Sequence, residues 1–480
     1  MSIEKLTVAE LSRALIERKL SAREAAEGYL RSIERQEGDI GAYLLVTAEK
    51  ALEQADDIDR RRASGEQLGA LAGVPMALKD NICTEGIRTT CASKMLGNFV
   101  PPYSATVAKR LEQAGCVLLG KLNMDEFAMG STTENSAFRK THNPIDITRT
   151  PGGSSGGSAA SAAACEAAFS LGTDTGGSIR QPAAFCGVVG LKPTYGSVSR
   201  SGVVAFASSL DQVGPLTRTA LDSAMVMSVL SAHDPLDSTS APREYPDFAS
   251  FAKDGVKGMK IAIIREFFDS FIAPENQKSV LAAADDFRRM GAAVEEVSAP
   301  TVANALPTYF IISAAEASSN LARFDGIRYG HRAEGAGSIE ELYARSRGEG
   351  FGAEVKRRLM LGTYILGEGC RETYYKQALR VRTLIIREFA SIFEKYDLIL
   401  TPTTPSAAHK LGDRNTDPDT MYLSDMCTVA ANLAGVPALD LPCGTNSMGL
   451  PMGMQLIAPA FGEPTIYRAA CAFERERGGI

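Results

Sequence analysis

Short apolar runs of strand length recur along this chain, and segments with helical periodicity separate most of them. These runs predict strands at 43–46, 74–78, 116–119, 168–171, 261–264, 293–297, 398–400, 438–441 and 452–457. Helices are predicted between many of them, for example at 105–114, 222–231, 277–290 and 374–395. Such alternation favours an α/β fold, with a large mixed, mostly parallel sheet covered by helices on both faces.

The first two helices have recognisable starts. Thr7 is followed three residues later by Glu10, and Ser21 by Glu24, with apolar residues at helical spacing after each pair. In such a capping box, the two side chains bond free backbone N–H groups at the helix start. We therefore expect helices to begin directly after Thr7 and Ser21.

No linker divides the chain. Its 480 residues are enough for two or three average domains. The longest turn-rich stretch, 233–246, is short and contains apolar residues, which is not typical of a linker. We expect a single domain over residues 1–480.

Composition argues against several functions. The formal net charge is −6 and the isoelectric point is near 5.6, which disfavours a broad basic face for nucleic acid. The nine cysteines are widely spaced with no C-x-x-C pair, as is typical of reduced thiols in the cytoplasm. No secretory signal is evident, and no apolar run approaches the roughly 20 residues that span a membrane. We therefore expect a cytoplasmic protein. The four histidines are scattered, so we expect no metal site.

Four glycine-rich segments carry the residues of greatest chemical interest. They read Gly73-Val-Pro-Met-Ala-Leu-Lys79-Asp, Pro151-Gly-Gly-Ser154-Ser-Gly-Gly-Ser, Gly172-Thr-Asp-Thr-Gly-Gly-Ser178-Ile-Arg and Gly190-Leu-Lys-Pro-Thr-Tyr-Gly196. Together they supply a lysine, serines on glycine-rich loops and a run of free backbone N–H groups. Hydrolysis of an amide needs a nucleophile, a proton acceptor and donors aimed at a developing oxyanion. The inventory therefore matches a serine nucleophile with lysine as its base.

The positions of these residues suit those roles. Lys79 closes an apolar run of strand length, and burial at a strand end would lower its pKa and make the neutral amine available. Thr175, Gly176 and Gly177 lead directly to Ser178. Glycine reaches positive φ and leaves room for substrate, so we expect the backbone N–H groups of these four residues to form an oxyanion hole.

Two charged residues flank the same loop. Asp174 precedes it and Arg180 follows it. We expect an ion pair between them that holds the loop in place.

Other interpretations of these residues remain open. Gly152-Gly-Ser-Ser-Gly156 fits the G-x-S-x-G pattern of an α/β-hydrolase, although the residues before it are turn-like rather than a buried strand. The segment 115–121 nearly fits a phosphate-binding loop, but the Ser or Thr that would hold Mg²⁺ is missing. Ser154 and Ser178 could instead cap helices, and Lys79 could be a surface lysine at a strand end.

The two glycine–serine loops and the strand-end lysine resemble the amidase signature family, whose members use a Ser–cis-Ser–Lys triad. The part of the chain that resembles the family signature covers about residues 70–230. It implies that Ser178 is the nucleophile, that Ser154 relays the proton and that Lys79 is the base. It also implies a cis peptide bond before Ser154.

Further segments resemble one branch of that family, the A subunits of glutamyl-tRNA(Gln) amidotransferases. They are Asn123-Met-Asp-Glu-Phe-Ala-Met-Gly130, Val204-Ala-Phe-Ala-Ser-Ser-Leu-Asp211, Leu361-Gly-Thr-Tyr364 and Tyr422-Leu-Ser-Asp425. The resemblance implies hydrolysis of glutamine. Arg358 would bind its carboxylate and Asp425 its ammonium group, while Tyr309 would donate a hydrogen bond or close the pocket. Helices at about 300–395 would form one wall of this substrate site.

The same resemblance implies partners. B and C subunits would complete a heterotrimer, and ammonia would pass through a tunnel to the B subunit, which would make most of the tRNA contacts. There, with ATP and Mg²⁺, ammonia would convert glutamyl-tRNA(Gln) to glutaminyl-tRNA(Gln), with aspartyl-tRNA(Asn) as an alternative acceptor. No cofactor is expected in this chain.

Two alternatives to this function are a stand-alone amidase for small or fatty amides and a non-enzymatic scaffold. The scaffold is disfavoured because all three triad positions are intact. A glutamine site should offer an arginine and an acid, whereas a fatty-amide site should be apolar throughout.

Overall fold

Eleven strands form one sheet in the part of the chain that the computed structural model describes, residues 2–268, 271–413 and 421–478. The strands are β1 (Tyr43–Val46), β2 (Pro75–Lys79), β3 (Val117–Leu122), β4 (Phe169–Asp174), β5 (Val189–Lys192), β6 (Gln212–Thr217), β7 (Lys260–Ile264), β8 (Ala293–Val297), β9 (Leu398–Pro402), β10 (Ala438–Thr445) and β11 (Pro451–Ile457). Across the sheet their order is β1-β3-β2-β4-β6-β5-β10-β11-β9-β7-β8.

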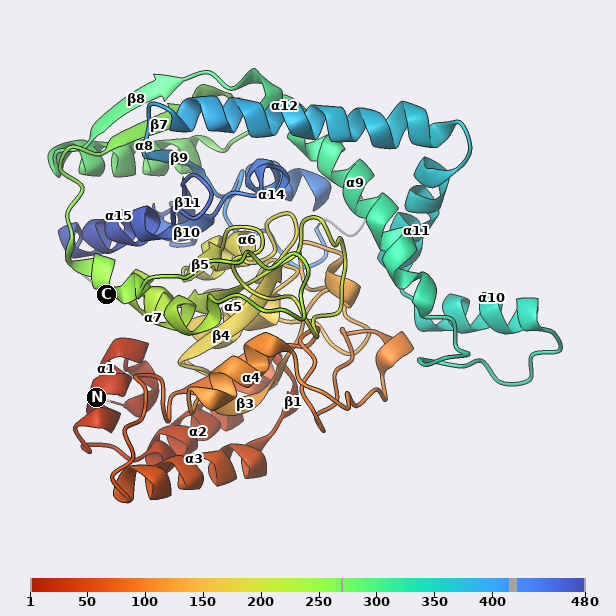
Figure 1. The fold of residues 1–480 in the computed structure, drawn as a ribbon, viewed down its shortest axis with the longest axis horizontal. Coiled ribbons are helices and arrows are strands. Elements are labelled where there is room, and N and C mark those ends of the chain that lie inside the picture. The colour runs from red at the N-terminus through yellow and green to blue at the C-terminus, as the bar shows by residue number, and fades with distance from the viewer. Residues whose placement is uncertain (1, 269–270, 414–420, 479–480) are drawn as a thin grey trace.

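Helices lie on both sides of this sheet (Figure 1). They are α1 (Val8–Ile16), α2 (Ala22–Ile40), α3 (Ala48–Ala63), α4 (Thr106–Gln113), α5 (Gly156–Ala163), α6 (Arg180–Cys186), α7 (Ala220–Leu230), α8 (Pro274–Arg289), α9 (Ala305–Asn320), α10 (Ile339–Gly350), α11 (Ala353–Leu366), α12 (Lys376–Phe393), α14 (Val429–Ala434) and α15 (Glu463–Glu476). The single mixed sheet with helices on both faces confirms the predicted α/β class.

Both predicted capping boxes are present. The Thr7 side chain accepts a hydrogen bond from the Glu10 N–H, and the Glu10 carboxylate accepts one from the Thr7 N–H. Ser21 and Glu24 make the same reciprocal pair. Helices α1 and α2 therefore begin where the sequence predicts.

The expected predominance of parallel strands is wrong. Four of the ten neighbouring pairs are parallel, and six are antiparallel. The middle of the sheet, from β6 to β11, consists of strands that reverse direction. A short turn at 446–450 joins β10 to β11, and antiparallel strands need no helical crossover. Apolar runs indicate where strands lie but not which way they point.

Strands β5 and β6 were not predicted. Both contain glycine, and β6 also contains Pro215, which weakens the strand signal. The glycine at 214 is needed because a Cβ there would overlap the Leu191 carbonyl on β5. Close approach of two backbones thus replaces the apolar pattern that would have revealed these strands.

The parallel strands β2, β3 and β4 determine where the candidate site lies. They are neighbours in the sheet and run in the same direction, so their carboxyl ends meet at one edge. Lys79 ends β2, Asp174 ends β4, and Asp125 follows the end of β3. Helices α9, α11 and α12 pack together beside this region, and α10 projects beyond them (Figure 1).

Among the residues that the structure describes, no helix is both long and apolar enough to cross a membrane.

Candidate active site

Lys79 is completely buried at the end of β2. Its Nζ lies 2.7 Å from Ser154 Oγ, 2.8 Å from Ser155 Oγ and 3.3 Å from the Thr173 carbonyl oxygen. Burial lowers the pKa of Lys79 to about 7, while neighbouring aspartates, Asp125 first among them, partly oppose the shift. A large share of Lys79 is therefore neutral near neutral pH and can accept a proton.

The Ser154 loop, residues 151–155 before α5, contacts both Lys79 and the Ser178 loop, residues 175–179 between β4 and α6. The peptide bond between Gly153 and Ser154 is cis, which confirms that expectation. The N–H of the next residue, Ser155, donates to the Ser178 carbonyl at 3.1 Å. Ser178 itself is 8% exposed. The structure thus brings together the lysine and both serines of the expected triad.

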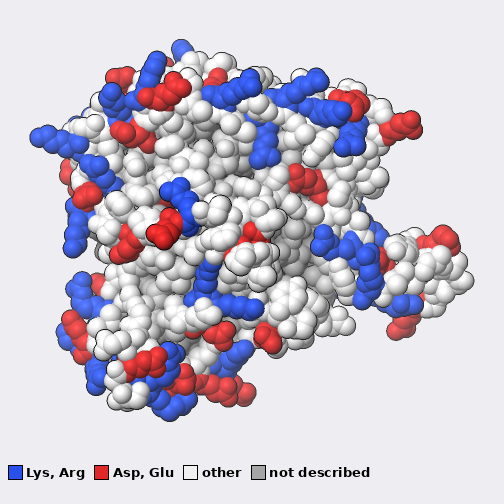
Figure 2. Space-filling view, viewed as in Figure 1, with Lys and Arg blue, Asp and Glu red and all other residues white. Residues whose placement is uncertain are grey.

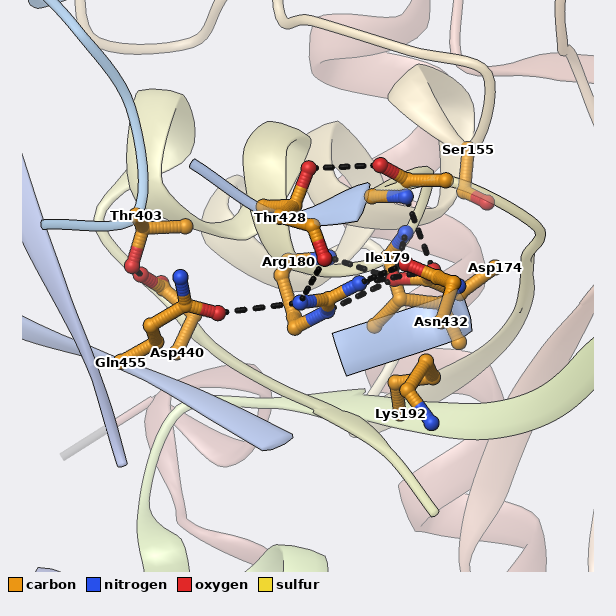
Figure 3. A network of polar contacts seen from close by, with 12 residues as sticks. Ser155, Asp174, Ile179, Arg180, Lys192, Thr403, Thr428, Asn432, Asp440 and Gln455 are labelled. Carbon is orange, nitrogen blue, oxygen red and sulfur yellow. Dashed lines mark hydrogen bonds and ion pairs between the residues drawn. The ribbon is translucent and has the colours of Figure 1, made fainter. Parts of the chain in front are cut away.

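A buried ion pair holds the Ser178 loop, as predicted. Arg180 Nε lies 3.0 Å from Asp174 Oδ2, and both side chains are fully buried (Figure 3). Arg180 also donates to Asn432 Oδ1 at 2.6 Å and to Gln455 Oε1 at 2.9 Å. Burial alone would raise the pKa of Asp174, but the Arg180 charge and hydrogen bonds outweigh it and hold that pKa at about 2. The carboxylate is therefore charged, and it binds both its own loop and Asn432 on α14, whose amide donates to Asp174 Oδ1 at 2.8 Å.

This arrangement changes the expected oxyanion hole at one position. The Gly177 N–H donates to Asp174 Oδ1 at 2.9 Å, so it is not free for a substrate as the sequence had suggested. In the described residues, the N–H groups of Thr175, Gly176 and Ser178 have no hydrogen-bond partner. These three remain as candidate donors to an oxyanion.

The three expected substrate residues come from three different elements. Tyr309 lies on α9, Arg358 on α11 and Asp425 in the short helix Leu423–Asp425. Each is at most 6% exposed. A Cβ on Gly176 would overlap the Tyr309 ring, so this ring lies directly against the Ser178 loop. Burial raises the pKa of Tyr309, the nearby Arg358 charge opposes the shift, and the nearby Asp425 adds to it.

Arg358 is surrounded by a charged partner and aromatic rings. Its Nε donates to Glu354 Oε1 at 2.8 Å, one helical turn earlier on α11. Its guanidinium carbon lies 5.2, 5.6 and 5.4 Å from the ring centroids of Phe310, Phe206 and Tyr422. Burial would lower the pKa of Arg358, but the Glu354 charge raises it above its usual value. The group is a permanent buried cation with donors beyond the one bonded to Glu354.

Asp425 supplies a carboxylate near this cation. Its Oδ2 accepts a hydrogen bond of 2.8 Å from Ser131 Oγ. Burial raises the pKa of Asp425 to about 7, although Ser131 and Arg358 both favour the ionised form. A bound ammonium group would favour ionisation further.

Several residues that contact the expected site residues were not predicted from the sequence. Glu354 bonds Arg358 and Ser131 bonds Asp425, the two charged residues expected to bind substrate, and Ser155 shares Lys79 with Ser154. The i, i+4 spacing of Glu354 and Arg358 was a usable signal. The role of Ser131 depends on a contact 294 positions away in the chain, which no local pattern reveals.

A buried lysine bonded to a serine, beside a second serine on a glycine-rich loop, defines a candidate site for serine amide hydrolysis. In the described part of the chain, no three His, Cys, Asp or Glu side chains are grouped so that they could hold a metal ion.

Comparison with known proteins agrees with this class. A family model described as Amidase matches residues 24–467. The chain belongs to the Amidase family. It is 57% identical over 475 residues to the A subunit of the glutamyl-tRNA(Gln) amidotransferase of Moorella thermoacetica, covering 99% of this chain and 97% of that protein. The A subunit of the same enzyme from Desulforamulus reducens is 53% identical over 475 residues, covering 99% of this chain and 98% of the other.

Solved structures show the same fold. The crystal structure of the A subunit of the glutamyl-tRNA(Gln) amidotransferase from Thermotoga maritima matches with a TM-score of 0.82 and 40% identity, covering 99% of this chain and 95% of that one. The peptide amidase of Stenotrophomonas maltophilia matches with a TM-score of 0.80 and 28% identity, covering 99% and 98%. Since both share the fold, the fold alone does not select the substrate.

Proposed function

We propose that this chain hydrolyses the side-chain amide of glutamine and supplies the ammonia to a partner subunit that amidates glutamyl-tRNA(Gln). The single observation that carries the choice of glutamine is the buried pair of opposite charges, Arg358 and Asp425, close to the Ser178 loop. The names of the relatives in Moorella thermoacetica and Thermotoga maritima support the same function.

In the proposed mechanism, Ser178 Oγ attacks the amide carbon. Its proton passes through Ser154 Oγ to the neutral amine of Lys79, 2.7 Å from Ser154. The N–H groups of Gly176 and Ser178, with that of Thr175, stabilise the oxyanion of the tetrahedral intermediate. The proton returns to the leaving nitrogen, so ammonia departs and a glutamyl ester of Ser178 remains. Water, deprotonated by the same relay, then releases glutamate.

Arg358 and Asp425 are proposed to recognise the two charges of free glutamine. The cation binds the α-carboxylate and the carboxylate binds the α-ammonium group, which a neutral amide lacks. Arg358 keeps Glu354 and Asp425 keeps Ser131 whichever amide binds, but an apolar amide would offer no polar group to the remaining donors of Arg358 or to the charge of Asp425, and buried charges are costly unless they are paired. A fatty-amide site would not be expected to retain them.

The partner subunits are also part of the proposal. The relatives are named as A subunits, which supports assembly with B and C subunits, binding of tRNA mainly by the B subunit, and use of ATP and Mg²⁺ there. The nine cysteines are widely spaced and include no C-x-x-C pair, which supports a reducing compartment such as the cytoplasm.

The test compares glutamine with a simple aliphatic amide such as propionamide. Hydrogen bonds to charged groups contribute about 1.5–3 kcal/mol, so Arg358→Ala should lower kcat/KM for glutamine by roughly 10- to 150-fold. Propionamide should be a poor substrate of the wild type and should be affected far less. If the wild type prefers propionamide, or if both rates fall equally in Arg358→Ala, the stand-alone amidase becomes the better account.

A further inference from the structure

Glu126 is a buried acid that takes no part in the proposed chemistry, yet both of its oxygens are engaged. It follows strand β3 in the short helix Glu126–Ala128 and is 2% exposed. Its Oε1 accepts a hydrogen bond of 2.5 Å from Ser93 Oγ, and its Oε2 accepts one of 2.8 Å from the Gly352 N–H. The side chain thus joins two segments that are far apart in the sequence.

Gly352 is the N-cap of α11, the helix that carries Arg358. A helix start has backbone N–H groups without partners and favours a carboxylate. Glu126 supplies that carboxylate from another part of the fold. A Cβ on Gly352 would overlap Glu126 Oε2, so the acid lies directly against the backbone there. The start of α11 therefore lies in direct contact with Glu126.

The adjacent residue, Asp125, holds the catalytic side of the site in the same way. Its carboxylate accepts hydrogen bonds from the N–H groups of Thr133, at 2.8 Å, and Thr132, at 3.2 Å. Its own N–H donates to the Ser154 carbonyl at 3.2 Å. A Cβ on Gly153 would overlap Asp125 Oδ2, so the loop before Ser154 packs directly on this acid.

The backbone around Glu126 is unusual. The next two residues, Phe127 and Ala128, have φ values of 49° and 62°, which favour glycine. Cys91 and Ala92, just before Ser93, have φ values of 54° and 53°. The Phe127 N–H donates to the Cys91 carbonyl at 3.0 Å, so these two segments are paired. Such backbone persists where surrounding contacts over-determine it, and it clusters at functional sites.

We propose that Glu126 is a positioning residue that sets Arg358 at the correct distance from the Ser178 loop by fixing the start of α11. Two consecutive acids contact the two halves of the site: Asp125 packs against the loop before Ser154, and Glu126 binds the start of α11. One short segment thereby sets the position of the Ser154 loop relative to α11. Glu126 touches no reacting atom and acts through Arg358. This inference rests on the proposed role of Arg358 in binding the glutamine carboxylate.

The experiment uses the full chain together with the subunits that co-purify with it. Glu126→Ala should raise KM for glutamine about tenfold while kcat changes less than about threefold, because Arg358 is displaced but the triad is not. Hydrolysis of propionamide should change by less than about threefold. Burial raises the pKa of Glu126 to about 7, and Glu126→Gln resembles the protonated form. The amide can still accept from Gly352, so Glu126→Gln should restore KM to within about threefold.

Glu349→Ala is the matched control. Glu349 is an exposed acid three residues before Gly352 that pairs with His331 and Arg345. The Glu349→Ala variant should have the wild-type kcat and KM for both glutamine and propionamide. Equal losses for glutamine and propionamide in Glu126→Ala would show a general structural role and overturn the inference. Should Glu126→Ala not fold, Ser93→Ala removes one of its two partners and should shift KM for glutamine in the same direction; no such shift would also overturn it.

A double variant separates this inference from the proposed function. If Glu126 acts through Arg358, the KM for glutamine of the double variant should be less than about twofold higher than that of Arg358→Ala alone. Independent, multiplying effects would overturn the inference. If the wild type does not prefer glutamine, the proposed function fails. If that preference is lost in Arg358→Ala but kept in Glu126→Ala, only the role of Glu126 fails.

Discussion

At the scale of single residues, the chemistry of Lys79 depends on its burial more than on its neighbours. Desolvation lowers the pKa of Lys79 to about 7, and the negative charges of Asp125, Asp174 and Asp211 are not enough to reverse this shift. Two serine hydroxyls and a carbonyl surround the amine at 2.7–3.3 Å. A solvated lysine would remain protonated at neutral pH and could not serve as a base.

The pH dependence of glutamine hydrolysis should report this property. In the proposed mechanism the active form of Lys79 is the neutral amine, so kcat/KM should rise as pH increases through about 7 and level off above it. Asp425, whose pKa is also raised to about 7, must be ionised to bind an ammonium group and should steepen the same limb. The measurement is kcat/KM between pH 5 and 9, with propionamide as the substrate that does not need Asp425.

Lys79→Arg is the accompanying variant. Arginine keeps the positive charge but does not lose its proton in a protein, so activity should fall by about 100- to 10,000-fold at every pH. Near wild-type activity in Lys79→Arg would mean that Lys79 acts as a fixed charge and that the base is elsewhere.

At the scale of elements, the Ser178 loop is held by its ion pair as well as by its glycines. Arg180, at the start of α6, binds Asp174 at the end of β4 and also reaches α14 and β11 through Asn432 and Gln455. Two strands and two helices are therefore joined at one guanidinium group (Figure 3). The conformation of the Ser178 loop therefore depends on these bonds of Arg180.

Removal of Arg180 should be strongly destabilising. Arg180→Ala leaves Asp174 as a buried charge without its partner, which costs about 3–5 kcal/mol of unfolding free energy. Arg60, exposed on α3 and paired with Asp57, is the control, and its loss should change stability by less than about 0.5 kcal/mol. Denaturant unfolding of both variants measures the difference. Similar stabilities of the two variants would contradict the role given to the network.

The elements show how far sequence reasoning reaches. All nine predicted strands and both capping boxes are present, because apolar runs and capping residues are local signals. Strands β5 and β6 were not predicted because close backbone contact at Gly214 takes the place of an apolar pattern. Triad residues could be placed because they lie in glycine-rich motifs. The loss of the Gly177 N–H to Asp174, and the contacts of Glu354, Ser131 and Glu126, depend on long-range packing that no motif encodes.

At the scale of the whole molecule, charge agrees with a division of labour between subunits. The formal net charge is −6. On the face shown in Figure 2, acidic and basic side chains are interspersed, without one extended basic surface. Binding of tRNA depends strongly on neutralising phosphates. In the proposed complex, tRNA contacts therefore fall mainly to the partner, and this chain supplies ammonia.

The most direct test of that claim is tRNA amidation by a complex that carries Ser178→Ala. The variant removes one oxygen from the site, so glutamine-dependent amidation should fall by several orders of magnitude. With ammonium salt and ATP in place of glutamine, the same complex should form amidated tRNA at the wild-type rate, because only the ammonia supply is lost. Undiminished amidation with glutamine in the folded Ser178→Ala complex would contradict the account.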